Sequence, residues 1–90
     1  NKLRLDAPMT WGELAMLLAP REEAIGRRIE KLRAARAPQH AYWGAMDWCA
    51  EQGILKYAMD PDAPVTSLPD DLFAPVHGFS RRSIYAAYRK

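Results

Sequence analysis

The sequence has one cysteine and no long apolar run, and these two shortages exclude several classes of protein. Cys49 has no partner for an internal disulfide and no second thiolate with which to bind a metal. No apolar stretch approaches the about 18 residues that a membrane-crossing helix needs. We therefore expect a cytoplasmic protein with no membrane partner.

Patterns that carry enzyme chemistry are also missing. His40, His77 and Cys49 lie too far apart to be zinc ligands, which are usually paired about two to five residues apart. No nucleophile lies in a sharp elbow or a glycine-rich loop. The acidic pair at 70–71 is typical of a helix start rather than of a catalytic dyad. The sequence therefore predicts no enzyme, no metal site and no cofactor.

The net charge is only +2, yet the charged residues are segregated along the chain. Residues 1–38 carry a formal charge of +3, residues 39–79 carry −5, and residues 80–90 carry +4. Separate basic segments suit a protein that binds a polyanion, because neutralised phosphates supply much of the affinity for nucleic acid. On charge alone, solvated helix faces explain the same pattern equally well.

Helix signals dominate the first half of the chain. Thr10 and Glu13 have the spacing of a capping box, which predicts a helix that begins at Thr10 and stops at Pro20. Residues 21–36 are rich in strong helix formers and predict a second helix. Its apolar residues recur at helical spacing, which predicts one buried stripe. The stripe consists of Ile25, Ile29 and Leu32.

The second half predicts shorter elements. A helix is expected at 39–51 with Gly53 as its terminal glycine, followed by a short extended segment at 54–57. Another small helix is expected at 66–73, and a last one follows the cap residue Ser80. The core is expected to include Tyr42, Trp43, Met46, either Cys49 or Ala50, Ile84 and Tyr88. The predicted fold class is all-α, a compact bundle of four to five short helices.

All 90 residues are predicted to form a single helical domain. Because the first residue is not Met and Lys90 ends a helical segment, we expect this domain to be a fragment of a longer protein. Its expected parts are a helix pair at 10–38, a central aromatic helix at 39–57 and a second helix pair at 66–90.

The pair of helices within residues 14–32 resembles the helix-turn-helix superfamily of DNA-binding domains. Leu14, Ala15 and Leu18 stand at that family's first-helix positions, and Ile25 stands at the buried position of its second helix. The resemblance implies that the second helix reads the major groove of DNA. A basic flank of this helix, with a small residue at its edge, would serve that purpose. The flank consists of Ala24, Arg27, Arg28 and Lys31.

Residues 73–87 resemble the same superfamily and include its turn glycine. Phe73, Gly78 and Ile84 stand at the first-helix, turn and buried second-helix positions, in the family's order. Ser80 would then open a recognition helix whose free N-terminal amides favour phosphate. If only one of the two segments reads bases, we expect it to be this one.

Together the two resemblances imply a function and a set of contact residues. The predicted function is sequence-specific binding of double-stranded DNA, in a transcriptional regulator or in a protein of a phage or mobile element, at the nucleoid. A homodimer and further domains of the same chain are the other expected partners. The predicted DNA-contacting residues are Arg21, Arg27, Arg28, Lys31, Ser80, Arg81, Arg82, Ser83, Tyr85 and Arg89.

Two alternatives to DNA binding stay open. Residues 40–66 resemble the S-layer homology module, a helical unit that binds cell-wall glycans, although Ser67 stands where that family places an arginine. The other alternative is a protein-interaction domain that grips its partner with the surface around Trp43 and Trp48.

Overall fold

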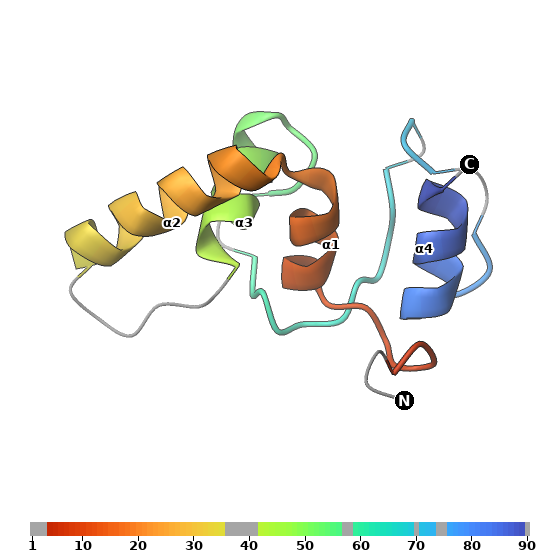
Figure 1. The fold of residues 1–90 in the computed structure, drawn as a ribbon. Coiled ribbons are helices and arrows are strands. Elements are labelled where there is room, and N and C mark those ends of the chain that lie inside the picture. The colour runs from red at the N-terminus through yellow and green to blue at the C-terminus, as the bar shows by residue number, and fades with distance from the viewer. Residues whose placement is uncertain (1–3, 36–41, 57–58, 70, 74–75, 90) are drawn as a thin grey trace. The chain divides into compact units, whose positions relative to one another are not determined.

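A computed structural model describes residues 4–35, 42–56, 59–69, 71–73 and 76–89, and for 31–35 the backbone alone (Figure 1). In this part of the chain the protein is all-α, as expected, with four helices and no strand. None of these helices is long and apolar enough to cross a bilayer. The helices are α1 (Trp11–Leu18), α2 (Arg21–Ala35), α3 (Trp43–Glu51) and α4 (Arg81–Tyr88).

The chain divides into two compact units, each of which is described by itself. Residues 10–63 form one unit, which contains α1, α2 and α3, and we call it the three-helix unit. Residues 1–9 and 64–90 form the other, which contains α4, and we call it the α4 unit.

The start of α1 is fixed by the predicted capping box. The Thr10 hydroxyl accepts a hydrogen bond from the Glu13 amide at 3.2 Å, and the Glu13 carboxylate accepts one from the Thr10 amide at 3.4 Å. A returning loop satisfies two further amides, because Trp11 and Gly12 donate to the carbonyls of Ala63 and Pro61 at 3.0 and 2.9 Å. These bonds leave α1 with a well-partnered first turn, as helix ends require.

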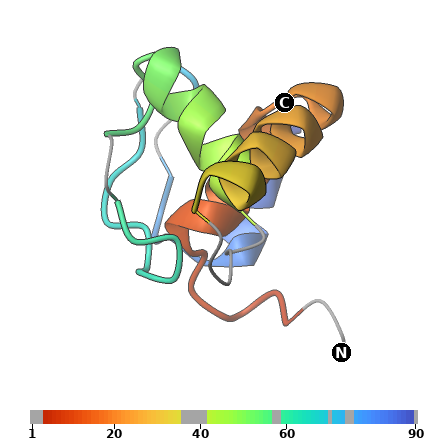
Figure 2. The same cartoon turned by 90° about the vertical axis from the view of Figure 1, so that its left-hand side faces the viewer.

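The contact between α2 and α3 is made by small residues, as the close crossing of the two helices in Figure 2 illustrates. Gly44 of α3 lies directly against the backbone of α2 at Ala24, and Ala24 is buried. The predicted buried stripe is therefore wrong, since Ile25 and Ile29 are 49% and 45% exposed. A glycine lets two backbones approach closely, so α2 turns the small residue Ala24 towards α3 rather than its branched residues. The Leu32 side chain lies outside the described part.

The boundaries of α3 match the sequence only in part. The helix begins at Trp43, later than expected, and residues 39–41 lie outside the described part. Met46 and Cys49 are buried as predicted, but Trp43 is only half-buried. Gly53 ends the helix in the left-handed conformation, with φ of 75°.

The segment that leaves α3 contains no strand. Residues 54 and 55 form a bend and residues 54–56 pair with no strand, so a short strand is not seen there, and residue 57 lies outside the described part. The chain then turns at Asp60, whose carboxylate accepts a hydrogen bond from the Asp62 amide at 2.9 Å. This turn brings the carbonyls of Pro61 and Ala63 to the start of α1.

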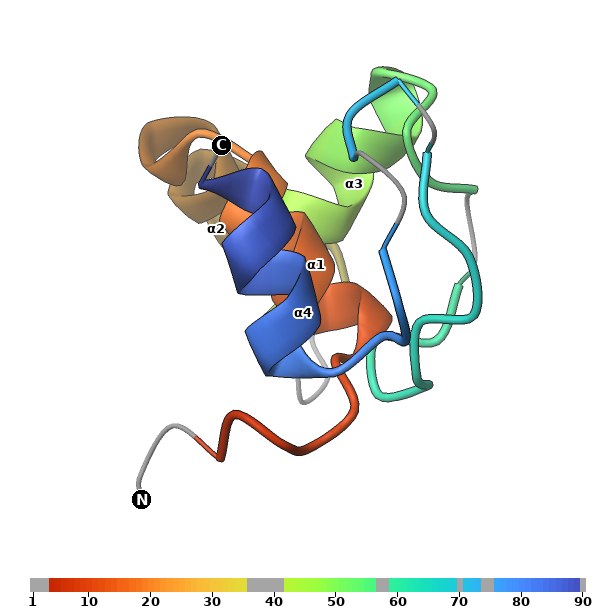
Figure 3. The same cartoon turned by 90° about the vertical axis from the view of Figure 1, so that its right-hand side faces the viewer.

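The α4 unit is held by an N-terminal arm, residues 4–9, which lies against the start of α4 (Figure 3). The Met9 amide donates to the Phe79 carbonyl at 2.8 Å, and the Met9 carbonyl accepts from the Val65 amide at 2.8 Å. Pro8 and Ser80 form an isolated antiparallel bridge. The arm is therefore paired on both sides, although it forms no regular strand.

The prediction of a small helix at 66–73 is wrong, because the described residues of that segment form only a turn at its end. The Leu72 amide donates to the Pro69 carbonyl at 3.1 Å, which closes the turn. Pro69 disfavours helical geometry at Leu68 and has no amide to donate, so the segment cannot continue as a helix. The predicted last helix and its cap Ser80 are confirmed.

The inner face of α4 differs from the prediction at one position. Ile84 is fully buried, as expected. Tyr88, expected in the core, stays 46% exposed and lies with its ring centroid 6.4 Å from that of buried Phe73. An edge position keeps the phenol hydroxyl near water, as is common for tyrosine.

The helix crossing yields a test with two helical glycines. A Cβ added at Gly44 would overlap the Ala24 carbonyl oxygen and lie 2.7 Å from the Arg28 amide nitrogen, whereas a Cβ at Gly26 would meet nothing within 4 Å. We expect Gly44→Ala to lower the free energy of unfolding by about 1–3 kcal/mol. The matched change Gly26→Ala should raise it by about 0.5–1 kcal/mol. Urea denaturation followed by circular dichroism measures both, and equal effects at the two sites would contradict the close crossing.

The thiol of Cys49 yields a second test. Cys49 is fully buried, its sulfur lies 3.9 Å from the Ala15 carbonyl, and burial raises the pKa of the thiol from 9.0 to about 11. The folded state therefore favours the protonated thiol, and its contribution to stability is complete below pH 9 and is lost as the pH rises towards 11. We expect the free energy of unfolding to fall over this window. The matched control is Cys49→Ala, which has no thiol, and in it the fall should be shallower. Identical slopes in the two proteins would contradict the buried-thiol account.

Candidate nucleic-acid interface

One member of the predicted DNA-reading flank of α2, Arg27, is paired with a carboxylate of α3. Nη1 of Arg27 lies 2.5 Å from Oε1 of Glu51 on α3, and Nε of Arg27 lies 3.9 Å from Oε2 of Glu23. The hydrogen bond to Glu51 raises the pKa of the Arg27 guanidinium, with desolvation opposing it. Arg27 is therefore already engaged with carboxylates of its own unit.

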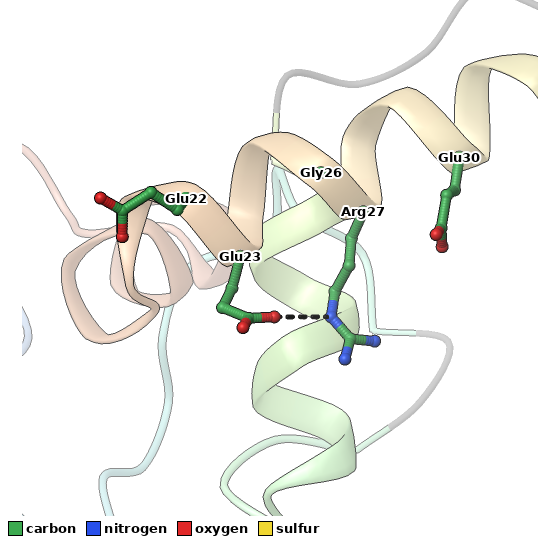
Figure 4. A pocket seen from close by; sticks show the side chains of 5 residues that line it. All are labelled: Glu22, Glu23, Gly26, Arg27 and Glu30. Carbon is green, nitrogen blue, oxygen red and sulfur yellow. Dashed lines mark ion pairs between the residues drawn. The ribbon is translucent and has the colours of Figure 1, made fainter.

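Carboxylates also dominate the hollow beside Arg27 (Figure 4). The hollow has a volume of about 290 Å³. Figure 4 shows the Arg27 side chain turned towards Glu23, with Glu30 one turn further along the same helix. Three glutamates and a single cation line this hollow, and their net negative charge disfavours a phosphate there. The lining residues are Glu22, Glu23, Gly26, Arg27 and Glu30.

The other predicted contacts on α2 are mixed. Arg21 and Arg28 are exposed and line a second, smaller hollow together with Met16 and Ile25. Lys31 lies within α2, but its side chain falls outside the described part. The structure therefore divides the α2 set, with Arg27 paired to acids and Arg21 and Arg28 beside apolar side chains.

The two serines predicted to contact DNA at the start of α4 have structural partners. The Ser80 hydroxyl accepts a hydrogen bond from the Ser83 amide at 3.2 Å, which makes Ser80 the N-cap of α4. The Ser83 hydroxyl donates to the carbonyls of Gly78 and Ser80 at 3.1 and 3.0 Å. Both hydroxyls therefore hold the turn that precedes the helix.

The expectation that α4 offers free N-terminal amides to phosphate is wrong. Arg81 and Arg82 donate their amides to the arm carbonyls of Ala7 and Leu5 at 3.0 and 2.9 Å. The next two amides are capped by Ser80, through its side chain and its carbonyl. With its first four amides occupied, the helix end lacks the open donors that a phosphate site needs.

Sequence reasoning missed the arm, although a signal for it exists. The segment Asp-Ala-Pro-Met-Thr at 6–10 recurs as Asp-Ala-Pro-Val-Thr at 62–66. The residues at the variable position, Met9 and Val65, are joined by a backbone hydrogen bond. A proline in each copy favours extended backbone, so the repeat could have indicated two extended segments that pair.

The outward face of α4 carries two exposed cations. Arg82, Ala86 and Arg89 follow one another at i, i+4 and i+7, and all three are exposed. Arg81 is half-buried, and Tyr85 is half-buried at the edge of this face. We call Arg82, Ala86 and Arg89 the basic face of α4.

The arm adds two charged groups near this face. Nε of Arg82 lies 3.5 Å from Oδ1 of Asp6, with both side chains largely exposed, so the pair is weak. Arg4 is exposed, precedes the carbonyl to which Arg82 donates, and has φ of 45°, a left-handed conformation that an arginine rarely adopts. The arm therefore brings a further arginine near the first turn of α4.

Formal charge follows the division into units. The α4 unit has six Lys or Arg and three acids, a formal charge of +3, whereas the three-helix unit has seven Lys or Arg and eight acids, a formal charge of −1. The basic character of the chain is therefore concentrated in the α4 unit.

Comparison of the chain with protein families, with curated proteins and with solved structures finds no match. Both helix-turn-helix resemblances stay predictions. The first has its two helices and its turn at 19–20, but its buried second-helix position, Ile25, is exposed. In the second, the described residues within 59–78 form no helix, so a first helix is not seen there. In the described part no three His, Cys, Asp or Glu side chains gather as a metal site requires.

The structural role of Ser80 yields a test that separates capping from DNA contact. We expect Ser80→Ala to lower the free energy of unfolding by about 1 kcal/mol, because the Ser83 amide loses its acceptor. Ser80→Asn is a matched change that keeps a capping oxygen, and it should change the free energy of unfolding by no more than about 0.3 kcal/mol. Thermal denaturation measures both. A loss in the asparagine variant as large as in the alanine variant would contradict the capping role.

Proposed function

We propose that the chain binds double-stranded DNA through the basic face of α4 and the neighbouring arm. The observation that carries the proposal is the exposed pair Arg82 and Arg89 on one side of a helix, in a unit of formal charge +3. Exposed cations on a rigid element contact phosphates without first breaking strong internal bonds.

The geometry of the face suits a sugar-phosphate backbone. Arg82 and Arg89 are seven residues apart, about 10 Å along the helix axis. Ala86 between them adds little bulk, so a strand can approach the helix closely. The bond from Arg82 to Asp6 is long and exposed, and it can be exchanged for a phosphate contact at little cost.

In this proposal any contacts with DNA bases are made by side chains and not by backbone amides. The amides at the helix start are occupied, so a guanine would be recognised by the guanidinium of Arg82, which offers two donors to the O6 and N7 acceptors of that base. On the helix-turn-helix resemblance we extend the proposal to sequence-specific binding. A role in transcription or in a mobile element, at the nucleoid, would follow from such specificity.

The proposal is tested by the salt dependence of binding. We expect the affinity for a random 20-base-pair duplex, measured by fluorescence anisotropy, to fall steeply as salt is raised, because bound phosphates release counterions. Arg82→Gln and Arg89→Gln should each reduce the slope of log K against log salt by about 1. The matched control Arg27→Gln removes the same charge from a residue held by carboxylates and should leave the slope unchanged.

Binding that is absent or independent of salt would overturn the proposal. It would also be overturned if Arg27→Gln weakened binding as much as Arg82→Gln, since charge number rather than the α4 face would then govern affinity. Selection of bound sequences from a random duplex pool tests specificity: a reproducible motif that Arg82→Gln degrades supports base reading by α4, and a pool without a motif restricts the function to phosphate binding.

A further inference from the structure

The three-helix unit exposes an apolar surface formed by α1 and α2. Met16 of α1 and Ile25 and Ile29 of α2 are 45%, 49% and 45% exposed. Ile25 and Ile29 are one helical turn apart, and Ile25 shares a hollow with Met16, so the three side chains form one surface. A single exposed aliphatic residue is ordinary, but a contiguous apolar patch indicates a binding surface.

The hollow in this surface has the size of one side chain. Its volume is about 200 Å³. An apolar cavity of about 150 Å³ is large enough to hold a benzene molecule, so this hollow accommodates one large aliphatic or aromatic side chain. The lining residues are Met16, Arg21, Ala24, Ile25 and Arg28.

The charges at the hollow indicate what kind of partner fits. Two arginines, Arg21 and Arg28, line it, and no carboxylate is among its described lining residues. The hollow on the other side of α2 has the opposite character, with three glutamates around Arg27. A partner at the apolar hollow would therefore place acidic groups beside its apolar side chain.

The same charges argue against a second copy of the chain as the occupant. Two-fold contacts are self-complementary, so a pair of copies centred on this hollow would bring Arg21 and Arg28 of both copies together. Like charges at such a contact oppose association, whereas a carboxylate-bearing partner is attracted.

We propose that this surface docks an amphipathic helix of a partner protein. One large apolar side chain of that helix fills the hollow, neighbouring apolar residues cover Ile29, and acidic residues at its flanks pair with Arg21 and Arg28. This is the helix-in-groove mode of peptide recognition. The proposal concerns the three-helix unit and stands independently of DNA binding by α4.

The test uses the 90-residue protein and two synthetic helical peptides. One peptide carries leucines at i, i+4 and i+7 with glutamates at the flanks, and the matched peptide has every glutamate replaced by lysine. Protein labelled at isoleucine and methionine methyl groups is titrated with each peptide and followed by NMR. We expect the acidic peptide to shift Met16, Ile25 and Ile29, while the methyl groups of Met9 and Ile84, which are fully buried, stay in place.

Three substitutions define the surface further. Ile25→Ser should weaken binding of the acidic peptide by at least about tenfold, because it removes a large apolar contact. Arg28→Glu should weaken the acidic peptide and strengthen the lysine peptide, each by about threefold or more. The matched control Leu72→Ser, which removes an equally exposed apolar side chain from the α4 unit, should change neither affinity. Unchanged circular dichroism spectra show that the variants are folded.

Several results would overturn the proposal. One is the absence of methyl shifts with the acidic peptide, and another is equal binding of both peptides, which would remove the role of the arginines. A dimer in sedimentation that Ile25→Ser dissociates would make a second copy the occupant. Shifts of Ile25 and Ile29 caused by duplex DNA would make nucleic acid the occupant. Failure of this proposal is distinguishable from failure of the DNA proposal, because the latter is tested by Arg82→Gln in α4.

Discussion

The close contact between Gly44 and the backbone of α2 at Ala24 determines how the three-helix unit presents its side chains. A side chain at Gly44 would force α2 away, so the crossing exists only because this residue has none. Once Ala24 is fixed inward, helical geometry fixes the rest of α2. Arg27 then lies within reach of Glu51, and Ile25 and Ile29 are left on the outside.

Features set by neighbours in sequence were predictable. The capping box at Thr10, the cap at Ser80 and the left-handed Gly53 involve groups at most a few residues apart, and each was expected from spacing alone. The all-α class follows from the same local signals. For the same reason α1 and α2 were expected nearly at their observed bounds.

Features set by distant partners were not predictable in this way. The spacing of Ile25 and Ile29 predicts that this side of α2 packs against the rest of the protein. In the structure α2 instead packs through Ala24, against Gly44 of α3, which leaves both isoleucines exposed. The carbonyls of Leu5 and Ala7 reach the start of α4 from the opposite end of the chain. A backbone carbonyl carries no residue signature, so the sequence of a helix taken by itself does not reveal which distant carbonyls occupy its first amides. The candidate site was therefore foreseen in its exposed cations, Arg82 and Arg89, and not in its helix terminus.

The two arginine-bearing helices show why charge in a sequence does not translate directly into binding. Arg27 and Arg82 both have a carboxylate partner within the chain. The bond of Arg27 is 2.5 Å long and joins two packed helices, and a second glutamate stands nearby, so a phosphate would have to displace a contact that the fold uses. The bond of Arg82 is 3.5 Å long between two solvent-exposed side chains, and water already competes for it. Availability for a polyanion therefore depends on what each arginine already contacts, and by that measure Arg82 of α4 is more available than Arg27 of α2.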